Sequence, residues 1–339
     1  MNALSKKWWI FFGLSFSVGA NVIQAQETTA NIDEFLASYP KTFVCVALPP
    51  YPTLGKTVYV DAALAKEIIN RGGYLGPCAT YGDKRSIGDG YFQSYVQLDP
   101  DGLPWGIGFE FPKSTLNKLP ALRHDGLSCF DINGDGKLTI DPAPGVAQEC
   151  ANGHERVLDL PLLAKIAPFK MALVNWQPYG HGPVGVYDVG HFDFHFYIQD
   201  IIARNFIRVG PCGLVTNCDD YATARKPVPA QYMHADFVDI GAVATRMGNH
   251  LVDTTSGEYH GQPFGESFAF GSYDGKVTFW EPVISKPYLE ALPFVCKEIK
   301  QPQAYQESGY YPKRYCIRYR AKRQDYTVSL ENFVFHQAQ

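Results

Sequence analysis

His191-Phe-Asp-Phe-His-Phe-Tyr197 is the stretch of sequence that decides the fold, because polar and apolar residues alternate strictly along it. On a β-strand this alternation places His191, Asp193, His195 and Tyr197 on one face and three phenylalanines on the other. Two histidines and an aspartate in register are typical of metal ligands or of an acid-base set that lines a cavity. A solvent-facing strand, or a network of satisfied hydrogen bonds, is the alternative interpretation.

The rest of the chain also favours strands over helices. It contains 31 Gly, 24 Pro, 21 Tyr and 22 Phe, and long helical periodicities are scarce. Asp99-Pro-Asp-Gly102 and Tyr273-Asp274-Gly275 predict hairpin turns. We therefore expect a mainly β protein with a minor α contribution, built on an antiparallel sheet or a barrel-like core. The expected strands are 42–47, 91–98, 105–111, 171–175, 190–198, 266–272, 276–284, 315–319 and 326–330, with one short helix at 61–71.

The N-terminus has the pattern of a secretory signal peptide. Lys6 and Lys7 precede an apolar run from Trp8 to Ala20, and the small residue Ala25 follows at cleavage distance. We predict a signal peptide over 1–25 and a single β-rich domain over 26–339, periplasmic or secreted, without stable insertion in the membrane. An uncleaved membrane anchor is the alternative. The net charge of −4 does not indicate nucleic acid as a partner.

All eight cysteines follow the predicted cleavage point, and an even number of cysteines in an oxidising compartment favours disulfides. We expect nearest neighbours to pair, because each bridge then closes a short loop. No Cys-x-x-Cys occurs, which argues against a zinc ribbon and a thioredoxin-type site. The cysteines are Cys45, Cys78, Cys129, Cys150, Cys212, Cys218, Cys296 and Cys316.

The polar segment 123–155 is predicted to be an excursion from the core, closed by the cysteines at 129 and 150. Its residues 131–141 match the start of a calcium loop, with a glycine at the sharp-turn position. Pro142 stands where a bidentate carboxylate is needed, so Asp141 or a more distant acid such as Glu149 would have to complete the shell. A metal-free cluster of Asx turns is the alternative. The predicted calcium ligands are Asp131, Asn133, Asp135, Lys137 and Asp141.

Three more residues are candidate ligands for a transition metal: His181, His250 and Glu281. Each alone is a weak signal. Residues four apart on a strand are about 13 Å apart, so His191 and His195 can barely share one ion. We expect one of them with Asp193, or a bulge between them, to hold zinc or another first-row ion together with His250 and Glu281 from other strands, while Asp193 could instead orient a histidine.

These residues also carry a resemblance to a family. The chain resembles exported proteins of uncharacterised function that combine a Trp-Asn-Pro-x-Gly-His segment with Pro-His-Phe-Asp-Phe-His-Phe-Tyr. The resemblance implies a site at His191, Asp193 and His195 but no particular reaction. Departures occur at Gln177, Gly190, Leu251 and 265–266, and the calcium-like loop is an addition. The matching segments are 176–181, 190–197, 247–250, 271–276 and 281–282.

Three functional hypotheses remain open. The first is an exported metal-binding protein, with a metal-dependent enzyme that acts on a small molecule through a His/Asp/Glu site as its more specific form. The second is a metal-free pocket for a small molecule or glycan, and the third is a structural envelope protein stabilised by calcium. The sequence has no His-Glu-x-x-His motif, Gly-x-Ser-x-Gly elbow or phosphate-binding glycine loop, and it does not predict the oligomeric state.

Overall fold

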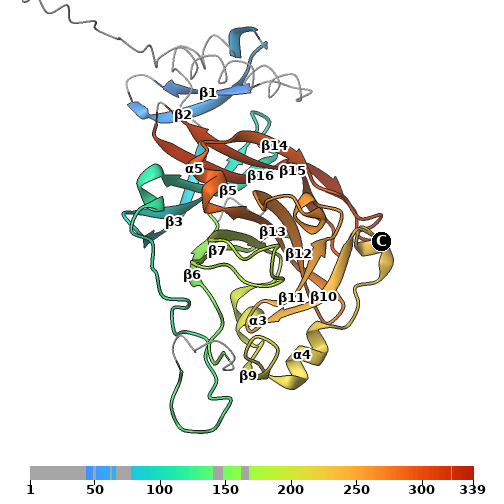
Figure 1. The fold of residues 1–339 in the computed structure, drawn as a ribbon. Coiled ribbons are helices and arrows are strands. Elements are labelled where there is room, and N and C mark those ends of the chain that lie inside the picture. The colour runs from blue at the N-terminus through green and yellow to red at the C-terminus, as the bar shows by residue number, and fades with distance from the viewer. Residues whose placement is uncertain are drawn as a thin grey trace, which may run out of the picture.

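Two antiparallel sheets form the main part of the structure, a computed structural model that describes residues 43–48, 51–61, 63–65, 78–139, 148–161, 168–321 and 323–339. The six-stranded sheet lies above the seven-stranded sheet in Figure 1. In spatial order, the seven-stranded sheet contains β10 (Phe237–Ala244), β11 (Gly248–Asp253), β12 (Glu266–Tyr273), β13 (Lys276–Ser285), β8 (His191–Tyr197), β7 (Met171–Gln177) and β6 (His154–Asp159).

The six-stranded sheet contains β14 (Phe294–Glu298), β15 (Gly309–Arg320), β16 (Asp325–His336), β5 (Pro104–Pro112), β4 (Gly90–Leu98) and β3 (Ala79–Ile87). A separate hairpin pairs β1 (Phe43–Leu48) with β2 (Tyr51–Tyr59), and β9 is Val209–Cys212. The helices whose bounds lie within the described residues are short. They are α3 (Ile201–Asn205), α4 (Cys218–Ala224), α5 (Lys286–Glu290), η1 (Lys113–Leu116), η2 (Ala230–Tyr232) and η3 (Gly257–His260).

Aromatic side chains fill the space between the two sheets. The rings of Phe192, Phe194 and Phe196 on β8 are fully buried and point toward the six-stranded sheet. The centroid of the Phe109 ring lies 5.3 Å from those of both Phe194 and Phe196, and the Phe92 centroid lies 5.6 Å from that of Phe192. These edge-to-face and tilted contacts add to the stabilisation from burying the rings. The opposite face of β8 is thereby left for its polar residues.

The predicted fold class is confirmed: the protein is mainly β, with antiparallel sheets and little helix. The sequence predicted either an antiparallel sheet or a barrel-like core. The structure has antiparallel sheets, and neither of them closes into a barrel among the described strands. The nine expected strands correspond to β1, β4, β5, β7, β8, β12, β13, β15 and β16. At the tip of the β12–β13 hairpin, Asp274 (φ 51°) and Gly275 (φ 72°) have the two positive φ angles of a type I′ turn.

Three disulfides join nearest neighbours in sequence, as predicted: Cys129–Cys150, Cys212–Cys218 and Cys296–Cys316. Cys78 is also disulfide-bonded, while the side chain of Cys45 lies outside the described residues. The bridges fit an oxidising compartment. The predicted signal peptide and most of the expected helix at 61–71 lie outside the described residues as well. No described helix is long and apolar enough to cross a bilayer.

Candidate metal centre

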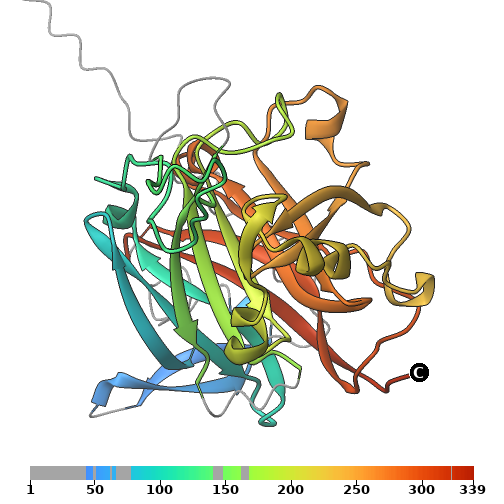
Figure 2. The same cartoon turned by 90° about the horizontal axis from the view of Figure 1, so that it is seen from below.

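The polar face of β8 is buried, although it points away from the core between the sheets. All seven residues of the strand are buried, and His191 and His195 have no exposed surface. This result excludes the solvent-facing strand considered above. Segments after β5, β7 and β9 lie over this face (Figure 2). Residues of these segments and of the sheet line a pocket of about 470 Å³. His181, Asp193, His250 and Glu281 are among the residues that line it.

The first ligand group consists of His195, His250 and Glu281, from three strands of one sheet. The register pairs Phe279 with Tyr197 and Val283 with Asp193, which places Glu281 opposite His195. The distance from His195 Nε2 to Glu281 Oε1 is 3.3 Å, and that from His250 Nε2 to Glu281 Oε2 is 3.8 Å. The ligand atoms of all three residues lie within 4.8 Å of one another.

A glycine and an aromatic ring shape this group. Phe279 packs against His195 and His250, with ring centroids 4.8 and 5.1 Å away. A Cβ atom on Gly271, the cross-strand neighbour of His250, would lie 2.1 Å from the Phe279 ring. Glycine is therefore needed at 271 for the ring to occupy this place between the two histidines.

The second ligand group consists of His181, His191 and Asp193. Here the Nε2 atoms of the two histidines are 3.2 Å apart, and Asp193 Oδ1 lies 3.2 Å from Nε2 of His191. In a tetrahedral site with bonds of about 2.0–2.1 Å to nitrogen, neighbouring ligand atoms are about 3.3 Å apart. The spacing within the second group thus matches the edge of a tetrahedral zinc site.

Backbone carbonyls fix the orientation of three of the four histidines. Nδ1 of His181, His191 and His250 lies 2.7–2.9 Å from the carbonyl oxygens of Gly182, Val189 and Ala242, respectively. A carbonyl oxygen can only accept, so each Nδ1 carries the proton and donates it. In the neutral ring Nε2 then keeps its lone pair, which is the second-shell arrangement that prepares histidine to bind a metal.

Burial controls the charge of the site. It lowers the pKa of His195 to about 3 and that of His181 to about 4, and it lowers the pKa of His250 in the same direction. Burial and the nearby Asp193 carboxylate raise the pKa of Glu281 well above its usual value. Burial would also raise the pKa of Asp193, but His191 outweighs this effect and holds it below its usual range. Histidine in its neutral form is the form that binds metals.

Several buried polar atoms around the two groups lack a hydrogen-bond partner among the described residues. They include Nε2 of His195, Oδ1 of Asp193 and Oε2 of Glu281. Buried polar atoms are nearly always satisfied, and a site for an ion is one of the recognised explanations for an exception. The two ligand groups therefore fit a cation on the basis of their donors, their spacing and their unsatisfied atoms.

The six residues that the sequence offered as transition-metal ligands form two groups rather than one, and four of them, His181, Asp193, His250 and Glu281, line the pocket. His191 and His195 fall in different groups, in agreement with the limit set by strand spacing. Sequence reasoning did not identify Asn175 and Gln177 as residues of the site. The register places them beside Asp193 and His191, respectively, and both line the pocket. Their signal was the alternation of polar residues along β7, which extends two residues beyond the expected strand.

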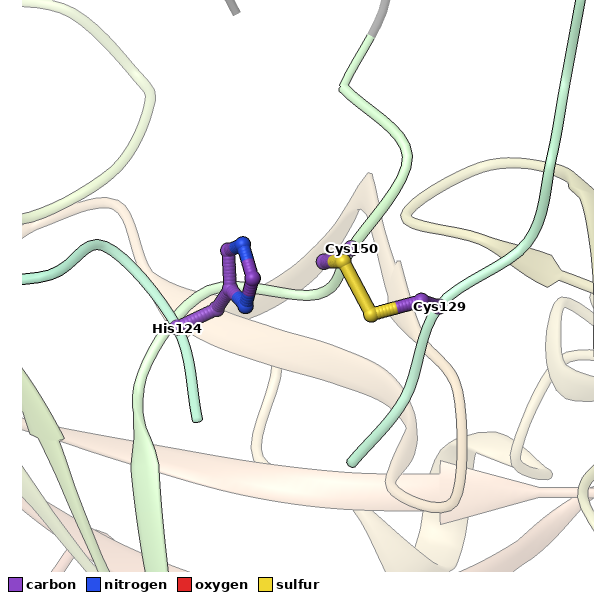
Figure 3. Close-up of side chains that lie close together, drawn as sticks. All are labelled: His124, Cys129 and Cys150. Atoms are coloured by element: carbon purple, nitrogen blue, oxygen red, sulfur yellow. A yellow bond between two sulfur atoms is a disulfide. The ribbon is translucent and has the colours of Figure 1, made fainter. Parts of the chain in front are cut away.

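Two other clusters of potential ligands are closed by disulfides. His124 lies beside Cys129 and Cys150, whose sulfur atoms are bonded to each other (Figure 3). Glu331 is similarly near the Cys296–Cys316 bridge. The thiolate is the form of cysteine that binds metals, so neither cluster offers a complete ligand set while its bridge is intact.

The calcium-like loop is held by its own hydrogen bonds. Asp131 accepts from the backbone N–H groups of Gly134 and Gly136, and Asp135 accepts from that of Lys137. Asn133 accepts from the N–H of Asp135. These contacts fit the metal-free alternative, and Asp141 lies outside the described residues. Calcium binding stays a prediction.

Comparison with known proteins gives no further assignment, because no family model, no curated protein and no solved structure matches the chain. By its fold and its site, the chain is a β-rich, disulfide-bonded protein with potential metal-ligand groups in a buried pocket.

Proposed function

We propose that this chain is an exported metalloprotein that binds a transition metal, zinc or a similar first-row ion, through His195, His250 and Glu281. The observation that carries the proposal is the first ligand group itself. Two nitrogen atoms and a carboxylate converge from three strands, at a place where His195 Nε2 and Glu281 Oε2 have no other partner among the described residues. A buried set of this composition suits zinc, whose common ligands are histidine and carboxylate groups.

The number of ligands is the second support for the proposal. Catalytic zinc sites have three protein ligands and keep the fourth position for water or substrate, whereas structural sites are closed by four. His250 and Glu281 line the pocket, so the open position would face its interior. An ion there would lower the pKa of a bound water molecule and polarise a carbonyl or phosphoryl oxygen.

The pocket walls favour a small molecule as the ligand. Its lining includes the polar residues Arg123, Asn152 and Asn175 and the apolar residues Leu214, Ile240 and Val252. Pockets of about 300–1,000 Å³ with such mixed walls are typical of small-molecule sites. We therefore place the chemistry on a small, partly apolar molecule that presents an oxygen atom to the metal.

Metal analysis of protein exported to the oxidising compartment and purified without a histidine tag tests this proposal. We expect a transition metal in the wild type and its loss in His195→Ala and His250→Ala, both checked for folding by circular dichroism. His260→Ala is the matched control, because His260 is exposed and bonds only to the Thr254 carbonyl oxygen in the described structure. Metal retained in both site variants, or wild type that binds no transition metal, would favour a metal-free pocket.

A further inference from the structure

We infer that the pocket holds two metal ions, the second bound by His181, His191 and Asp193. This inference rests on the proposed function, since it places a second divalent first-row cation beside the first one. Its main observation is independent of the first group: two histidine nitrogens and a carboxylate oxygen lie within 4.8 Å of one another on a loop and a neighbouring strand.

The Nε2 lone pairs of His181 and His191 point toward each other. Both Nδ1 atoms donate to backbone carbonyl oxygens, those of Gly182 and Val189, so neither neutral ring has a proton on Nε2. The two Nε2 atoms are nevertheless 3.2 Å apart. Two acceptors at this distance repel each other unless a cation or a proton lies between them. A metal ion satisfies both lone pairs at once.

Asp193 supplies the third ligand and is oriented for it. The Gln177 side-chain amide donates to Oδ2 of Asp193 at 3.2 Å, which leaves Oδ1 directed to His191. Asp193 is 4 % exposed, and its Oδ1 has no hydrogen-bond partner in the described part of the chain. A carboxylate held through one oxygen by a second-shell amide, with the other oxygen unsatisfied, is arranged as a metal ligand.

The alternative to a metal is a proton. A doubly protonated His191 could donate to Asp193 or to His181 and would also relieve the repulsion. With Asp193 that arrangement is a buried ion pair, which loses the hydration of both charges. The single proton on His191 Nε2 would also have to serve two acceptors, Asp193 Oδ1 and His181 Nε2, each 3.2 Å away. The metal uses all three ligand atoms.

The two ions would be neighbours but would not share a ligand. The first group is built around His195 and the second around His191 and Asp193. Two residues along a strand span about 7 Å, whereas two-metal sites with a common bridging oxygen have ions about 3.5–4 Å apart. His181 and Asp193 from one group, and His250 and Glu281 from the other, line the same pocket. Each ion would therefore offer its open position to one bound molecule.

Titration of the metal-free, exported protein with zinc ions alone tests the inference, with bound zinc measured after removal of free metal. We expect two zinc ions per chain in the wild type and in the His260→Ala control. His181→Ala and His250→Ala should each bind one, and the double variant none. His181 lies on a loop rather than a strand, and circular dichroism with intact disulfides verifies that each variant is folded.

The outcomes separate this inference from the proposed function. One zinc in the wild type, lost in His250→Ala and kept in His181→Ala, would overturn the second ion and leave the first in place. One zinc lost in both variants would mean a single shared ion and would also overturn the inference. No bound zinc in the wild type would refute both proposals.

Discussion

Glu281→Gln should leave the metal-free protein stable, but it should remove most of the stabilisation that metal binding provides. Glu281 is 2 % exposed, and its Oε2 atom has no hydrogen-bond partner among the described residues. Burial raises the pKa of this carboxyl well above its usual value, with a further contribution from Asp193. In the metal-free protein the group is therefore protonated more readily than in the unfolded chain, and glutamine has a similar shape without the ionisation.

The sign of the pH effect follows from linkage. A group whose pKa is raised on folding contributes stability that is fully present below its unfolded pKa and is lost as pH rises through its folded pKa. For Glu281 this window extends upward from 4.5, its ordinary value. Within it, metal-free wild type should lose about 1.4 kcal/mol per pH unit relative to metal-free Glu281→Gln. The buried histidines are present in both proteins, so their effects cancel in this comparison.

Metal should stabilise wild type more than Glu281→Gln. Binding to the folded state alone stabilises it by about 2.7 kcal/mol at a metal concentration 100 times the dissociation constant. Wild type should show this gain at pH 7, and Glu281→Gln should lose most of it, because an amide is a weaker ligand than a carboxylate. Urea unfolding with chelator at pH 5 and pH 7, and then with zinc at pH 7, measures both effects.

Two results would refute this reasoning. Metal-free Glu281→Gln that is several kcal/mol less stable than metal-free wild type at pH 7 would show that the carboxylate charge itself holds the fold together. Equal stabilisation of both proteins by zinc would show that Glu281 is not a ligand. Glu290→Gln is a control, because Glu290 is exposed and pairs with Lys286 on the surface.

Three further predictions concern the disulfides, the calcium-like loop and the core between the two sheets. Reducing agent should lower the melting temperature, because loss of a native bridge from a small secreted domain typically costs about 2–5 kcal/mol; an unchanged melting curve with all thiols alkylated would contradict this. Calcium should raise the melting temperature, and Asp131→Ala with Asp135→Ala should abolish the rise; a wild type that is indifferent to both millimolar calcium and chelator would eliminate the loop as a site. Phe194→Ala should cost about 3–5 kcal/mol in urea unfolding while metal stays bound, since the ring is fully buried against Phe92 and Phe109; a cost below about 1 kcal/mol would mean that the sheets do not pack through this ring.

Alternation along β8 allowed this strand and both of its faces to be predicted from the sequence. Turn residues did the same for the hairpins β4–β5 and β12–β13, because their signals are local. Strands β2, β3, β6, β9, β10, β11 and β14 were not predicted. Of these, β3, β6, β10, β11 and β14 carry no strict alternation, and all five lie at or next to an edge of one of the two large sheets, where strand propensity is a weak local signal.

The candidate ligands could be predicted as residues but not as groups. Strand spacing indicated that His191 and His195 would not share an ion. The partner of each depended on long-range structure: the loop after β7 brings His181 to His191, and pairing through β12 brings His250 toward Glu281. Neither of these contacts has a local signal in the sequence, and so the division into two groups required the structure.

Crystals of the zinc-loaded, exported protein, measured on both sides of the zinc absorption edge, test the central claim most directly. The anomalous difference map should contain one peak between His195, His250 and Glu281 and a second between His181, His191 and Asp193, each about 2 Å from its ligand atoms. A map without a peak at the first group, from crystals whose mother liquor contains zinc at neutral pH, would contradict the account.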